Sequence, residues 1–186
     1  MSNSAVKVEG IEAGTWSIDP SHSDISFSVR HLMVSKVRGS FTSFEGNLTI
    51  GENPLDSSVE VTIDLASVDT RDANRDAHLR SADFFGVEVH PTATFRSTGV
   101  HARGDGFVVD GELSIHGVTR PVSLDLEFNG TTSDPYGGRR AGFSASTELS
   151  RSDFGIDISM PLDGGGVVLG DKIKLEIEVE AILQVG

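Results

Sequence analysis

The sequence predicts an all-β protein that folds as a single domain. Apolar and polar residues alternate with period two along most of the chain, which is typical of strands with one buried face. Turn-forming residues separate many of the alternating stretches, and only one stretch breaks the alternation. A length of 186 residues is enough for one domain with a sizeable core.

Eight stretches of the chain are predicted to be strands. The last is the clearest, because apolar residues from Ile173 to Ala181 alternate with Lys174, Glu176, Glu178 and Glu180. In chain order the predicted strands cover residues 25–29, 46–50, 59–65, 93–95, 107–115, 122–128, 143–149 and 173–181. Turns are expected at 51–54, 104–106, 134–138 and 164–166, where Gly, Pro, Asn and Asp gather.

One short helix is predicted over residues 71–85, with the sequence RDANRDAHLRSADFF. This stretch is rich in good helix formers and has no β-branched residue. Asp72 or Asn74 is expected to cap its start.

Composition and charge exclude several classes of protein. The chain has 15 Lys and Arg against 28 Asp and Glu, and a net charge of -13 argues against binding nucleic acid or an anionic membrane surface as its main task. It has no cysteine, which excludes disulfides, Cys-zinc sites and thiol catalysis.

The first 14 residues are expected to form a flexible segment before a single domain over residues 15–186. They contain no apolar run of the length that a signal peptide needs, so we expect a cytoplasmic protein. No stretch reaches the roughly 20 apolar residues of a membrane-spanning helix.

Alternation alone leaves two architectures open, a sandwich and a closed barrel, because both bury one face of each strand. The predicted inner faces are almost entirely Val, Ile, Leu, Phe, Ala and Gly. Any cavity between them is therefore expected to be dry and apolar.

Few residues suggest chemistry. His31 is predicted to point inward, like Phe27 and Val29, either as a core histidine or as a polar group at the mouth of a cavity.

No metal site is predicted. His22 follows a turn, and the spacing of His22 and His31 is not that of a known metal motif. No catalytic triad stands out, and the three glycines at 164–166 lack the context of a phosphate loop, so we predict neither catalytic residues nor a cofactor.

The charged residues of the predicted helix have two interpretations. A solvated helix face explains most of them. The alternative is that Arg75 or His78 faces the opening of a barrel and binds an anionic group.

Five stretches resemble the YceI-like family in residues and in order. They are WSIDPSHSDISFSVRHLMVSKVRGSF (16–41), NRDAHLRSADFF (74–85), HPTATF (90–95), GELSIHGVTRPV (111–122) and RSDFG (151–155). The resemblance implies an eight-stranded antiparallel lipocalin-like barrel with one helix near its end and a long apolar tunnel inside. It also implies binding of polyisoprenoid chains and formation of homodimers.

The resemblance and the alternation together predict the ligand-binding residues. The inward residues expected to line the tunnel are Phe27, Val29, Val61, Ile63, Phe107, Val109, Leu124, Leu126, Phe143, Leu175 and Ile177, and the polar residues expected at its mouth are His31, Arg75 and His78. The predicted function is non-enzymatic binding, storage or transport of a long isoprenoid-type lipid, with transient membrane contact and no nucleic-acid partner. A lipid-modifying enzyme that uses His31 and a scaffold protein with a filled core stay open as alternatives.

Overall fold

The computed structural model describes residues 11–31, 34–156 and 169–184, which form one 11-stranded sheet. The predicted turn at 164–166 lies outside these residues. The strands are β1 (Gly14–Ile18), β2 (Asp24–His31), β3 (Ser35–Phe41), β4 (Phe44–Ile50), β5 (Ser58–Asp64), β6 (Val68–Asp69), β7 (Thr92–Arg103), β8 (Gly106–Ile115), β9 (Val118–Ser133), β10 (Arg139–Ser150) and β11 (Leu169–Leu183).

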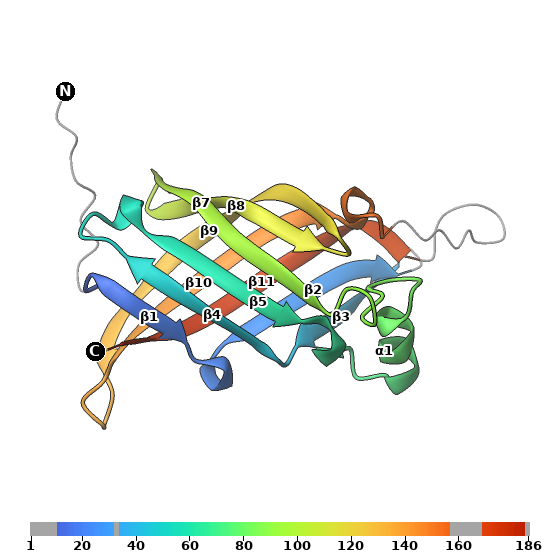
Figure 1. The fold of residues 1–186 in the computed structure, drawn as a ribbon, viewed down its shortest axis with the longest axis horizontal. Coiled ribbons are helices and arrows are strands. Elements are labelled where there is room, and N and C mark those ends of the chain that lie inside the picture. The colour runs from blue at the N-terminus through green and yellow to red at the C-terminus, as the bar shows by residue number, and fades with distance from the viewer. Residues whose placement is uncertain (1–10, 32–33, 157–168, 185–186) are drawn as a thin grey trace.

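Eight of these strands close into a barrel (Figure 1). β1 pairs with β4 on one side and with β11 on the other, and the ring runs on through β5, β7, β8, β9 and β10. Every one of these pairings is antiparallel, and a closed ring has no free sheet edge. The eight-stranded antiparallel barrel is therefore confirmed, and the sandwich is wrong.

The other three strands extend the sheet from one side of the ring. β2 pairs with β11 and β3, and the short β6 pairs with β3. β1 and β2 pair with successive parts of β11, since Ile18 is opposite Ala181 and Asp24 is opposite Glu178. The strand predicted at 25–29 is thus β2, and the ring strand β1 was missed because five residues are too short for a clear alternation.

β7 is much longer than the predicted strand at 93–95. Its alternation is interrupted by a bulge between Ser97 and Gly99, after which the inward phase moves from Ala93 and Phe95 to Val100. A periodicity of two cannot be followed across such an extra residue.

The single α-helix, α1 (Ala73–Arg80), is shorter than the predicted 71–85. Asp72 caps its start by accepting hydrogen bonds from the backbone N–H groups of Asn74 and Arg75. After Ser81 the chain turns so that Phe84 is buried and the Phe85 ring packs 5.9 Å from that of Phe41. The helix ends at Arg80 because the backbone of its C-cap, Ser81, is extended, and Phe85 then packs against the barrel core. α1 lies at one end of the barrel (Figure 1).

The described residues also contain four short 3-10 helices and a core inside the barrel. None of the described helices is long and apolar enough to cross a membrane. Ile11 packs with the buried residues around Trp16. The 3-10 helices are η1 (Pro20–His22), η2 (Pro54–Asp56), η3 (Leu65–Ser67) and η4 (Arg151–Phe154).

Candidate functional site

The barrel interior contains a cavity of about 200 Å³. Side chains from all eight ring strands line it, together with Ile25 of β2, Phe41 of β3 and Phe85 after α1. An apolar cavity of roughly 150 Å³ already stays dry and binds a small hydrocarbon. The cavity is therefore large enough to hold a small hydrocarbon group.

The wall of the cavity is apolar. Among the described residues that line it, only Ser57 and Ser58 are polar, and no titratable side chain is present. The two serines lie where β5 begins, at the end of that strand away from η3 and α1, and the Ser57 hydroxyl accepts a hydrogen bond of 3.2 Å from the Gly51 N–H. Such a wall favours the binding of a hydrocarbon, because burial removes apolar surface from water. The described residues of the wall include no charged group that could bind an ion.

Nine of the fourteen predicted site residues line this cavity. They belong to β5 and to the consecutive ring strands β8, β9, β10 and β11, whose inward residues lie opposite one another from strand to strand. Their contact with a ligand stays a prediction. The nine are Val61, Ile63, Phe107, Val109, Leu124, Leu126, Phe143, Leu175 and Ile177.

Phe27 and Val29 of β2 point inward but do not line the cavity, unlike Ile25 of the same strand. The Phe27 ring packs 5.5 Å from the Phe41 ring and lies over Gly39. A Cβ at Gly39 would come within 2.5 Å of Phe27 Cζ, so the glycine is what admits the ring. This part of the interior is filled by protein side chains.

The predicted polar residues are not brought together at the cavity. Arg75 is exposed and donates hydrogen bonds of 2.7 and 2.6 Å to the hydroxyl and carbonyl oxygens of Thr70. His78 is exposed and lies 3.0 Å from an Asp83 carboxylate oxygen. Neither lines the cavity. His31 ends β2, opposite Ser35 and Leu169, but its side chain lies outside what the structure describes.

Several lining residues are not among those that the sequence predicts. Phe85 falls in the predicted helix, Val100 follows the bulge in β7, and Ile11 precedes the predicted domain. Phe95 lay in a predicted strand and could have been found from its inward phase.

Comparison with known proteins identifies the family to which this barrel belongs. A family model described as the YceI-like domain matches residues 16–181.

This chain belongs to the YceI-like family.

Relatives of known sequence and structure agree with this assignment. A UPF0312 protein of Pseudomonas aeruginosa (strain LESB58) is 43% identical over 164 residues, which is 88% of this chain and 83% of the relative. The crystal structure of the Campylobacter jejuni YCEI protein superimposes with a TM-score of 0.70 at 27% identity, covering 100% of this chain and 98% of the other. A polyisoprenoid-binding domain from Saccharophagus degradans has the same fold, with a TM-score of 0.70, 16% identity and coverage of 93% and 100%.

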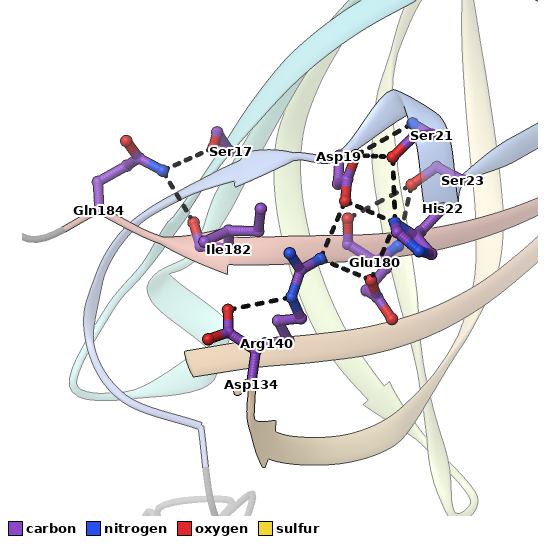
Figure 2. A network of polar contacts seen from close by, with 10 residues as sticks. All are labelled: Ser17, Asp19, Ser21, His22, Ser23, Asp134, Arg140, Glu180, Ile182 and Gln184. Carbon is purple, nitrogen blue, oxygen red and sulfur yellow. Dashed lines mark hydrogen bonds and ion pairs between the residues drawn. The ribbon is translucent and has the colours of Figure 1, made fainter. Parts of the chain in front are cut away.

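The YceI-like barrel also carries a polar network on its outside (Figure 2). Nη1 of Arg140 in β10 lies 2.9 Å from Asp19 Oδ2 and 2.7 Å from Glu180 Oε2, and its Nε lies 3.2 Å from Asp134 Oδ2. The guanidinium thereby ties β10 to the segment after β1, to β11 and to the β9–β10 turn.

These contacts shift the ionisation of the groups involved. Hydrogen bonds from the Ser21 hydroxyl and from Arg140 lower the pKa of Asp19 well below its ordinary value. Hydrogen bonds from the backbone of Gly138 and Tyr136, with Arg140 beside them, lower the pKa of Asp134. The carboxylates are therefore charged at neutral pH.

Asp19, His22 and Glu180 form the one group of three metal-ligating residues found among the described residues. His22 Nδ1 lies 2.8 Å from Asp19 Oδ2, but Arg140 contacts both carboxylates and supplies the positive charge that they need. Ion pairing with Arg140 accounts for the close approach of these side chains, and the absence of a metal stays a prediction.

Proposed function

We propose that this YceI-like protein binds one long apolar isoprenoid-type lipid in the barrel cavity and stores or carries it without changing it chemically. The observation that carries the proposal is the cavity wall, whose described residues are apolar except for Ser57 and Ser58. The Saccharophagus degradans domain with the same fold supports the choice of ligand, since it is named for polyisoprenoid binding.

The energetics of such a cavity suit a carrier. Each CH₂ group moved out of water contributes about 0.8 kcal/mol, so a prenyl chain gains strongly relative to water. A bilayer offers the same chain an equally apolar environment, so the difference between the two is small. A lipid can therefore be loaded from a membrane and released again.

The two alternatives have less support. A scaffold with a filled core does not account for an apolar cavity of about 200 Å³. A lipid-modifying enzyme needs an acid or base within reach of the ligand; no titratable side chain occurs among the described lining residues, and the side chain of His31, on which this alternative rests, is not described.

Native mass spectrometry of the purified protein tests the proposal. We expect an additional mass that organic extraction removes and that is identified as a prenyl lipid. The extracted protein should then take up an added polyprenol. An extracted protein that takes up no polyprenol contradicts the proposal, and a chemically altered polyprenol would favour the enzyme.

A cavity-filling substitution tests the location of the lipid. Ala145 lines the cavity between Leu126 and Ile177, and a phenyl ring there would displace at least two CH₂ groups of the ligand. At about 0.8 kcal/mol each, Ala145→Phe should weaken polyprenol binding by roughly tenfold or more. Thr94→Phe, on the outward, exposed face of β7, is the control and should bind as the wild type does. Equal affinity in both variants would place the lipid elsewhere.

The homodimer and the cytoplasmic location belong to the same proposal and rest on the family resemblance and the sequence. Light scattering coupled to size-exclusion chromatography tests the dimer. Cell fractionation tests the location.

A further inference from the structure

Three cations lie on the outer face of the β2–β3 hairpin. Arg30 is directly opposite Lys36, and Arg38 is opposite Ser28 on the same face. The alternation places all three outside, since the neighbouring Val29 is buried. All three are exposed, and none forms an ion pair with a carboxylate of the described residues.

This arrangement opposes the stability of the hairpin. Side chains directly opposite each other in an antiparallel pair have Cβ atoms about 4.5–5.5 Å apart, and like charges there are destabilising. Arg38 lies on the diagonal, about 7–8 Å away, and adds to the repulsion. An anion outside the protein would relieve it.

The cations lie at one end of a charge gradient on the barrel surface. Along β11 the outward residues are first Lys172 and Lys174 and then Glu176, Glu178 and Glu180, and Lys174 itself lies 3.3 Å from Glu176 and opposite Glu148. The register sets Lys174 opposite Ser28 and Glu178 opposite Asp24, so the cations of β2 and β11 gather near the β2–β3 turn and the acids near η1. In a chain of net charge -13, this end therefore differs from the average surface.

An exposed apolar residue lies beside the cations. Val34 in the β2–β3 turn is 84% exposed, and it precedes Lys36 and Arg38 in β3. The end of β2 and the start of β3 lie at the barrel end that carries α1 (Figure 1). Cations flanking an exposed apolar side chain match the interface of an anionic bilayer, where headgroups meet hydrocarbon. A nucleic acid or a free phosphate would not use the apolar side chain.

We propose that Arg30, Lys36, Arg38 and Val34 form a docking surface for a bilayer that contains anionic phospholipid. The biological purpose rests on the proposed function, because docking holds the barrel at the membrane from which the lipid is loaded. The acidic remainder of the surface restricts docking to this end, since the same bilayer repels it.

Co-sedimentation with vesicles tests the docking surface. Vesicles of phosphatidylcholine with phosphatidylglycerol should bind the protein, pure phosphatidylcholine vesicles should bind it much less, and added salt should weaken the binding. The double variant Arg30→Gln/Lys36→Gln should bind about thirtyfold more weakly, from the contribution of two surface cations. Its thermal midpoint should be unchanged or higher, because a repulsion is removed.

A matched control and a second variant make the test specific. Arg96→Gln/Arg103→Gln removes two exposed cations of β7 and should leave vesicle binding within about twofold. Val34→Ser should weaken binding to the anionic vesicles with the charge unchanged. Equal loss in both double variants, or equal binding to both kinds of vesicle, would overturn the proposal. So would binding to single-stranded RNA that Arg30→Gln/Lys36→Gln abolishes and Val34→Ser leaves intact.

The vesicles contain no isoprenoid, so this test is independent of the cavity. Vesicle binding by a protein that holds no polyprenol would refute only the proposed function. A protein that holds a polyprenol but ignores anionic vesicles would refute only the docking surface.

Discussion

Arg140 shows how a single side chain can connect several segments of this barrel. Its guanidinium contacts carboxylates from three separate segments, at Asp19, Asp134 and Glu180. Asp19 and Asp134 are mostly shielded from solvent, while His22 beside them is largely exposed. The network therefore depends on the ionised carboxylates more than on the histidine.

Stability should fall in acid because of this network. Hydrogen bonds from Ser21 and Arg140 hold the pKa of folded Asp19 below its ordinary 3.8, so the unfolded chain takes up the proton first as the pH falls. The stabilisation is thus fully present above about pH 4 and decreases below it. Thermal melts from pH 7 to pH 2 should show that Asp19→Asn flattens this decrease.

An exposed ion pair serves as the control for the acid melts. Arg103 lies 3.4 Å from Asp125, and both side chains are well exposed. Asp125→Asn should leave the pH dependence of the melting point as in the wild type. If Asp125→Asn flattens it as much as Asp19→Asn does, the Arg140 network is not the cause.

At the scale of elements, α1 is attached to the barrel by a small buried polar cluster. Asp76 is only 8% exposed and accepts hydrogen bonds from the N–H group and the hydroxyl of Thr70, at 2.9 and 2.5 Å. Arg75 donates hydrogen bonds to the hydroxyl and carbonyl oxygens of the same threonine. The cluster fixes the start of α1 to the segment after β6.

Removing Asp76 should therefore loosen the helix from the barrel. Asp76→Ala leaves a buried N–H and hydroxyl of Thr70 without their acceptor, which costs about 1–3 kcal/mol. Urea unfolding should show this loss of stability. Asp83→Ala, at an exposed position after the helix, should change stability by no more than about 0.5 kcal/mol. Equal effects would mean that Asp76 has no special role.

At the scale of the whole molecule, closure of the ring depends on β1. This strand of five residues pairs with both β4 and β11, and its Trp16 is 0% exposed. The indole N–H donates a hydrogen bond of 3.0 Å to the carbonyl oxygen of Glu12. The Trp16 side chain thus connects the segment before β1 with the sheet formed by β1, β4 and β11.

Truncating this side chain should strongly destabilise the barrel. Trp16→Ala removes a fully buried indole and should cost about 3–5 kcal/mol in urea unfolding. The control Tyr136→Ala, at a position that is 95% exposed, should cost no more than about 0.5 kcal/mol. A loss below about 1 kcal/mol for Trp16→Ala would mean that ring closure does not depend on this residue.

Local patterns in the sequence predicted most of the strands and the start of the helix. The alternation from Ile173 to Ala181 appears as β11, the turn at 134–138 connects β9 and β10, and Asp72 caps α1. Each of these features depends on residues a few positions apart, so the sequence contains the needed information.

The cavity and the ring were decided only by the tertiary structure. Alternation shows which face of a strand is buried but not which residues lie opposite that face. It therefore could not predict that Phe27 packs over Gly39. Nor could it predict that Phe107 and Leu126 line a cavity. The bulge in β7 hid Val100, and pairing of Trp16 with Leu183 joins residues from the two ends of the chain. Such contacts depend on the path of the entire sheet, and no local spacing of residues specifies that path.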